Sequence, residues 1–127
     1  GYELDLNLLS DGEKQEVAEQ IRQFKTYGPL IHNGKYYRLT NPMAEDAALW
    51  EFAAQDGSEV LVQGMLFHAE ANVLRRTVQL RGLDAEKRYR LDGTEQVYTG
   101  AALMAGGVLL PKAWGDYTPV TMHFSEV

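Results

Sequence analysis

The stretch AALWEFAAQDGSEVLVQGMLFH, residues 47–68, has the pattern of a β-hairpin and decides the fold. Two runs of strand-forming residues, 47–54 and 59–68, flank the turn Gln55-Asp56-Gly57-Ser58. The Asp-Gly pair favours a hairpin because it accepts the positive φ angles of a type I′ turn. The second run has apolar residues at consecutive positions, which places them on both faces of the strand. Such a strand is typical of the centre of a sheet covered on both sides, so we expect the hairpin to anchor the core.

One shorter run precedes this hairpin and several follow it. The candidate strands are residues 36–39, 77–80, 87–91, 97–98 and 120–124. The glycines at 82 and 93 mark turns between them. Short strands at this spacing, joined by glycine-containing turns, are typical of antiparallel sandwiches. We therefore predict a mainly β fold, an antiparallel β-sandwich preceded by one N-terminal amphipathic α-helix.

The expected helix lies before the first strand. Ser10 and Glu13 have the spacing of a capping box, so the helix should begin near residue 11. Gly28 and Pro29 predict that it ends near residue 27. One narrow apolar stripe at helical spacing should be buried, and it consists of Val17, Ala18, Ile21 and Phe24. The change from helical to strand period predicts a division into residues 1–30 and residues 31–127.

Composition restricts the class of protein. A chain of 127 residues is the size of one domain. Its net charge of -6 gives no general attraction for nucleic acid, and we expect no such partner. The absence of cysteine excludes disulfides and thiolate metal sites and favours a cytoplasmic protein. No apolar run is long enough for a bilayer, so we expect no membrane partner.

Few residues have the spacing of a catalytic or metal site. Glu3 and Asp5 lie about 7 Å apart on one side of an extended segment, a separation found between glycosidase carboxylates, yet acids before a helix also complement its N-terminal charge. The histidines, His32, His68 and His123, match no compact ligand pattern. We expect them to be structural or exposed, with His123 on a solvent face.

Two further groups of residues suggest binding surfaces. The segment 75–90 is locally basic, which suits either an anion site or a solvated face or interdomain contact, and its cations are Arg75, Arg76, Arg81, Lys87, Arg88 and Arg90. Aromatic residues could stack on sugars, and the candidates are Tyr36, Tyr37, Trp50, Trp114 and Tyr117. We assign Trp50 to the core and Trp114 to a contact surface, where domain packing is favoured over a ligand. Gly106-Gly107 precedes a strand-like run, so it does not form a phosphate-binding loop.

Several segments in the same order resemble one known family. They are GYELDL at 1–6, IRQFKTYGPLI at 21–31, GKYYRLTNP at 34–42, LRGLDAEKRYRLDG at 80–93 and YTGAALMAGGVLLP at 98–111. Together they resemble the C-terminal end of glycoside hydrolase family 36 α-galactosidases. The resemblance implies that residues 1–30 are the end of a catalytic (β/α)8 barrel, including its last helix. It also implies that residues 31–127 are the antiparallel β-sandwich that follows the barrel.

The resemblance implies a division of labour in a longer polypeptide. Family members release terminal α-linked galactose with retention, and their two catalytic aspartates lie upstream of this region. We therefore expect no catalytic residue, metal or cofactor in this chain, and we leave its substrate-binding residues unassigned. The expected partners are the missing barrel and, as a further possibility, a second copy, with α-galactoside bound only through the parent enzyme. The alternative is a carbohydrate-binding module that uses exposed aromatics such as Trp114.

Overall fold

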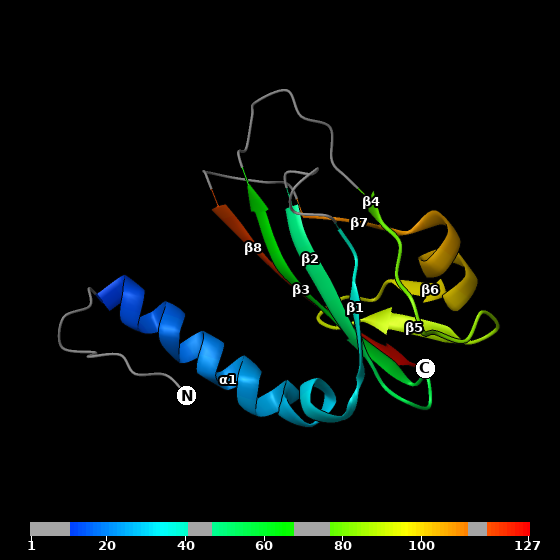
Figure 1. Cartoon of the computed structure of the whole chain (residues 1–127), viewed down its shortest axis with the longest axis horizontal. Helices are drawn as coiled ribbons and strands as arrows, with labels where there is room; N and C mark the ends of the chain where they lie inside the picture. Colours follow the sequence, from blue (N-terminus) through cyan, green and yellow to red (C-terminus); the bar gives the residue numbers. More distant parts are fainter. Residues whose placement is uncertain (1–10, 41–46, 68–76, 112–116) are drawn as a thin grey trace.

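The computed structural model describes residues 11–40, 47–67, 77–111 and 117–127. A six-stranded sheet in the order β1-β2-β3-β8-β5-β6 forms one layer, and the two-stranded sheet β4-β7 lies in the other (Figure 1). All strand pairs of both sheets are antiparallel. The elements are α1 (Asp11–Asn33), β1 (Lys35–Arg38), β2 (Ala47–Ala53), β3 (Glu59–Phe67), β4 (Thr77–Val78), β5 (Arg88–Leu91), β6 (Val97–Thr99), the π-helix η2 (Ala102–Gly106), β7 (Val108–Leu109) and β8 (Tyr117–Glu126). The predicted class, an antiparallel sandwich preceded by a helix, is confirmed.

The predicted hairpin is β2 and β3, but its turn differs from the predicted type. The Gly57 N–H donates to the Ala54 carbonyl oxygen at 3.0 Å, which centres the turn on Gln55 and Asp56. A type I′ turn on Asp56-Gly57 would place this bond one residue later. Gly57 has a φ of 74° and follows the turn, while the Asp56 side chain accepts a hydrogen bond from the Ser58 N–H at 3.0 Å.

The core lies between the large sheet and the second layer, which contains β4, β7 and η2 (Figure 1). We call the sheet face toward this layer the inner face and the face toward α1 the outer face. Val60, Val62 and Phe124 from the sheet join Leu80 and Leu103 from the second layer in one buried cluster. Buried Tyr89 also fixes a turn, because its hydroxyl donates to the Gly57 carbonyl oxygen at 2.6 Å.

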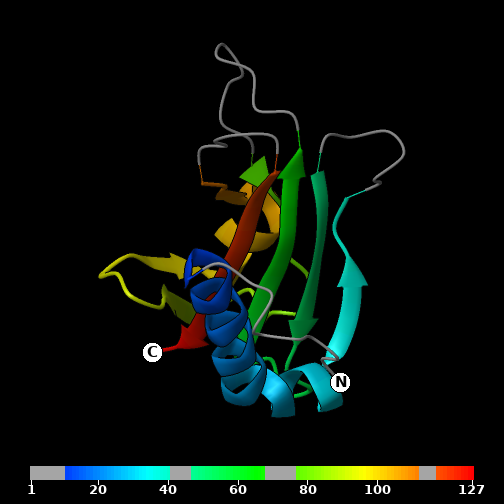
Figure 2. The ribbon, with the colours of Figure 1, turned by 90° about the vertical axis from the view of Figure 1, so that its left-hand side faces the viewer.

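Helix α1 is longer than predicted and turns a different side to the sheet. It continues past Gly28 and Pro29 to Asn33, because Leu30 is buried there and its carbonyl oxygen accepts the Gly34 N–H. Figure 2 shows α1 crossing the outer face over β8 and β3. Its contacts come from Gln23 and Tyr27, whereas Ala18 and Ile21 of the predicted stripe lie on other sides of the helix. The side chains of Val17 and Phe24 are outside the described residues.

The sequence did not predict η2 or β7. The backbone of η2 ends where Gly107, with a φ of 84°, donates its N–H to the Ala102 carbonyl oxygen at 2.9 Å. Gly107 passes close to β4, and a Cβ atom there would lie 2.7 Å from the Val78 carbonyl oxygen. Gly106-Gly107 therefore serves a tight turn into β7, in agreement with the expectation that it does not form a phosphate loop.

A substitution at Gly64 tests the central position of β3. A Cβ atom at residue 64 would lie 2.0 Å from the Ala48 carbonyl oxygen of the neighbouring strand, so Gly64→Ala must displace backbone. We expect it to lower the free energy of unfolding by more than about 2 kcal/mol in urea titrations. The control is Gly28→Ala in α1, where nothing lies within 4 Å and the change should stabilise by about 0.5 to 1 kcal/mol. Equal effects of the two variants would contradict the described packing of β3.

Candidate interaction face of the sheet

The two faces of β2 have the opposite polarity to that of an ordinary core strand. Its burial alternates strictly, with Leu49, Glu51 and Ala53 buried and Trp50 and Phe52 half-buried between them. The carboxylate therefore faces the inner side and the two large aromatic rings face the outer side. The prediction that Trp50 belongs to the core is wrong, because the alternation of the strand assigns that side to its neighbours Leu49 and Glu51.

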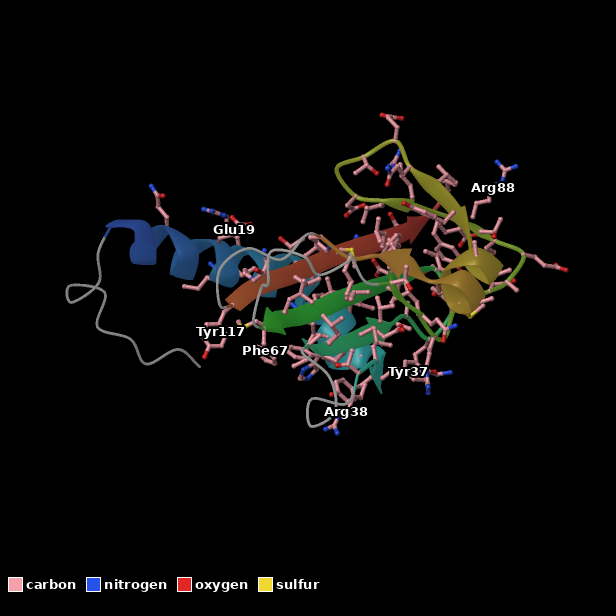
Figure 3. All side chains as sticks on the ribbon, turned by 90° about the horizontal axis from the view of Figure 1, so that it is seen from above. Glu19, Tyr37, Arg38, Phe67, Arg88 and Tyr117 are labelled. Atoms are coloured by element: carbon pink, nitrogen blue, oxygen red, sulfur yellow. The ribbon has the colours of Figure 1, made fainter. Side chains whose placement is uncertain are left out.

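The outer face continues this apolar character across three strands. The strand register places Met65 opposite Pro119 and Phe67 opposite Tyr117, and cross-strand partners share a face. Phe67 and Tyr117 meet edge to face with ring centroids 5.9 Å apart, and Figure 3 shows them together at one end of the sheet. Tyr117 is 64% exposed. We call Trp50, Met65, Phe67, Tyr117 and Pro119 the outer-face patch.

Helix α1 covers the other end of the outer face, above His123. The Nδ1 atom of His123 lies 2.6 Å from an Asp92 carboxylate oxygen, and its Nε2 atom lies 2.7 Å from a Glu59 carboxylate oxygen. The ring of Tyr27 from α1 packs on the imidazole with centroids 4.9 Å apart. Burial, followed by the carboxylates of Asp92 and Glu59, raises the pKa of the Tyr27 hydroxyl. The His123 side chain is only 10% exposed. The prediction that it faces solvent is therefore wrong, because α1 covers this part of the outer face.

The His123 cluster does not have the geometry of a nucleophilic triad. Asp92 contacts the imidazole as the acid of a triad does, but the other ring nitrogen contacts Glu59 instead of a hydroxyl. The nearby Ser125 hydroxyl donates to Asp92 at 3.4 Å. The contacts of this cluster therefore hold the ring in place and offer it no serine to activate.

A second buried carboxylate lies on the inner face. Glu51 has no exposed surface, and its Oε1 atom accepts the Arg81 N–H at 2.5 Å. Its Oε2 atom has no hydrogen-bond partner among the described residues. Burial raises the pKa of Glu51 to about 7, although the Arg81 backbone bond and charge act in the opposite direction. The carboxyl group thus joins the sheet to the segment after β4.

Most of the candidate residues from the sequence do not converge on one site. Among described residues, His32 is exposed on α1, and Lys87 pairs with Glu126 at 3.3 Å. Arg88 and Arg90 are exposed on β5, as expected for a solvated face (Figure 3 labels Arg88). Within the described ranges, no group of three or more His, Cys, Asp or Glu side chains could hold a metal ion. Tyr36 is 55% exposed on β1, Tyr37 packs partly buried against the core, and the Arg81 N–H donates to Glu51. The other candidates lie outside the described residues, and they are Glu3, Asp5, His68, Arg75, Arg76 and Trp114.

The residues that form these two polar clusters and that sequence reasoning missed are Tyr27, Glu51, Glu59 and Asp92. The alternation of residues 47–53 was a usable signal for Glu51, because it puts Glu51 on the side of Leu49. The His123 cluster left no local signal, since its members come from α1, β3, β8 and the turn after β5.

The fold defines an antiparallel β-sandwich domain preceded by a helix. Residues 47–124 match the model of the glycosyl hydrolase family 36 C-terminal domain, and the chain belongs to that family. It is 39% identical, over all of its length, to the bifunctional α-galactosidase/sucrose kinase AgaSK of Mediterraneibacter gnavus. It also superposes on the galactosidase domain of AgaSK with a TM-score of 0.94 at 38% identity. The TM-score is 0.89, at 37% identity, for the family 36 α-galactosidase AgaB of Geobacillus stearothermophilus.

The chain corresponds to only a small part of each of these relatives. The whole chain is matched in each case, but it spans only 14% of the AgaSK sequence and 18% and 17% of the two solved chains. Within the described ranges, no helix combines the length and the apolar character needed to cross a membrane.

The pKa of Glu51 gives a prediction for stability against pH. Because folding raises this pKa from 4.5 to about 7, the stabilising contribution is complete below pH 4.5 and is lost as the pH rises to about 7. Glu51→Gln keeps an acceptor for Arg81 but cannot ionise. Between pH 4.5 and 7.5 the wild-type chain should therefore lose on the order of 3 kcal/mol more unfolding free energy than the variant. Urea titrations across this range would measure the difference.

The matched control for this experiment is Glu95→Gln on the exposed turn before β6. Its stability profile should run parallel to that of the wild type. A Glu51→Gln profile that is also parallel would show that folding does not raise the pKa of the Glu51 carboxyl group.

Proposed function

We propose that the chain is the non-catalytic C-terminal β-sandwich domain of an α-galactosidase-like enzyme and that it supports the catalytic barrel. In this proposal residues 1–30 are the end of the barrel and residues 31–127 are the sandwich. Helix α1, which runs on to Asn33, connects the two. The parent enzyme would hydrolyse terminal α-linked galactose with retention, and its catalytic aspartates would lie upstream.

The single observation that supports this role most directly is the outer-face patch. A sheet face with half-buried Trp50, Met65 and Phe67 beside exposed Tyr117 is typical of a surface that another element covers. Helix α1 covers only the His123 end of the face. The relatives AgaSK and AgaB are about six to seven times longer than this chain, so a parent of similar length would supply the missing cover.

Helix α1 supports the same proposal from its other side. Tyr27 contacts the sheet, and at 100° per residue Ala18 lies about 180° and Ile21 about 120° around the helix from it. Both are small or apolar and half-buried. A barrel that packs on this second side would use the apolar stripe while the sandwich uses the first side.

The remaining parts of the proposal have less support. The carbohydrate-binding alternative is not favoured: the exposed rings of Tyr36 and Tyr117 lie on the outer face assigned here to the barrel contact, and Trp114 lies outside the described ranges. A cytoplasmic location and a possible homo-oligomer stay predictions, which cell fractionation and solution mass of the full-length parent would test.

A pair of lysine substitutions tests the outer-face patch. In the full-length parent, Tyr117→Lys should accelerate thermal inactivation several-fold, because it buries a charge between sandwich and barrel. In the 127-residue chain the same change removes only the ring contact with Phe67 and should lower the unfolding free energy by no more than about 1.5 kcal/mol. The control is Leu109→Lys in β7, which is 46% exposed on the opposite layer and should be neutral in both. If Tyr117→Lys is also neutral in the parent, the patch does not contact the barrel.

The non-catalytic assignment has its own test. The 127-residue chain should not release aryl alcohol from an aryl α-galactoside above background, since the proposed catalytic aspartates lie upstream. Turnover that disappears in Glu3→Gln or Asp5→Asn would contradict the assignment.

A further inference from the structure

His123 lies where the helix, the sheet and two carboxylates meet, and its surroundings suit a recognition role. We propose that His123 is the residue of the sheet on which α1 docks. Its imidazole would bind the helix in the doubly protonated form, held between Glu59 and Asp92. In the proposed function α1 belongs to the barrel, so His123 would also set the position of the barrel relative to the sandwich. Only that last consequence rests on the proposed function.

The two short contacts of the imidazole are the basis for the charge proposed for its ring. Both ring nitrogens lie within 2.7 Å of a carboxylate oxygen, one from Asp92 and one from Glu59. A neutral imidazole has a single N–H donor, so its other nitrogen would direct a lone pair at a carboxylate. The protonated ring donates to both, and such charge-assisted bonds are short and strong. The geometry is therefore that of a cation bound by two anions.

The backbone fixes the acids on either side of this cation. Glu59 starts β3 and lies diagonally across the β3–β8 pair from His123, because its own partner is Ser125. Asp92 follows β5, and its N–H donates to the His123 carbonyl oxygen at 2.8 Å. Asp92 is thus tied to the same residue by its backbone and by its side chain. Glu59, Asp92 and His123 all come from the sheet or from the turn after β5, so their mutual contacts do not depend on α1.

Tyr27 of α1 supplies the aromatic ring that packs on this cation. Tyr27 lies 4.9 Å from His123 between centroids, at an interplanar angle of 37°, within the range of cation–π attraction. The raised pKa of Tyr27 keeps its hydroxyl neutral beside the two carboxylates. One turn earlier, Gln23 accepts the Thr121 hydroxyl at 3.3 Å, and one turn later Leu30 is buried. Three successive turns of α1 therefore meet the sheet, with His123 under the middle one.

The proposal is tested by hydrogen exchange in α1 of the 127-residue chain. Tyr27→Leu keeps apolar bulk but removes the ring, and His123→Gln removes the charge. Each should speed exchange of the amides of residues 20–30 about five- to tenfold and leave those of β3 unchanged. The double variant should show little more than either single one, because both remove the same interaction. His32→Gln, an exposed histidine on the same helix, is the control and should change nothing.

Two results would overturn the proposal. One is α1 exchange in Tyr27→Leu equal to that in His32→Gln, which is decisive even if His123→Gln fails to fold, because Tyr27 lies outside the sheet. The other is a nitrogen-15 spectrum of the wild-type chain in which the His123 ring bears one proton instead of the expected two. Neither result bears on the outer-face patch, whose test is Tyr117→Lys in the full-length parent.

Discussion

The pairing of β3 with β8 is the interaction on which the rest of the structure depends. It joins residues 59–67 to residues 117–125 along their whole length and links the N-terminal strands to β5 and β6. Because β3 is central, its side chains must be covered on both faces. Val60 is covered by the second layer, whereas Leu61 is equally buried but lies outside that core cluster, on the face toward α1. One face is completed within the sandwich. Among the described residues the other is covered only in part, and that difference is the basis for proposing an interaction surface there.

The same constraint explains the inverted polarity of β2. This arrangement of Glu51 on the inner face and Trp50 and Phe52 on the outer face would not favour the stability of an isolated sandwich. Burial of a carboxyl group lowers the free energy of unfolding, and the exposed parts of the two rings do not raise it. The arrangement suits a sheet whose outer face is buried against a larger partner. The Glu51 contact with Arg81 then ties the second layer to the strand that displays those rings, so core and interface are mechanically connected through β2.

The sequence predicted the elements well where one local pattern decided them. The Asp-Gly turn between two strand-forming runs was sufficient for β2 and β3, alternation was sufficient for β8, and the spacing of short strands with the resemblance to family 36 predicted the sandwich. It failed where tertiary contacts override local rules. Pro29 lies inside α1 because burial of Leu30 holds the last turn in place, and the contacts of His123 join residues 27, 59, 92 and 123, which no spacing rule relates. Trp50 was assigned to the core because it lies between Leu49 and Phe52, although the alternation of its own strand indicated the other face.

The central claim is that the outer face of the sheet is an interface with the rest of a longer polypeptide. Hydroxyl-radical footprinting of the 127-residue chain and of its full-length parent measures this directly, through the oxidation rates of Tyr117 and Phe67 relative to Leu109. The account predicts that Tyr117 and Phe67 react readily in the chain and become protected several-fold in the parent, while Leu109 reacts equally in both. Equal reactivity of Tyr117 in the chain and in the parent would contradict it.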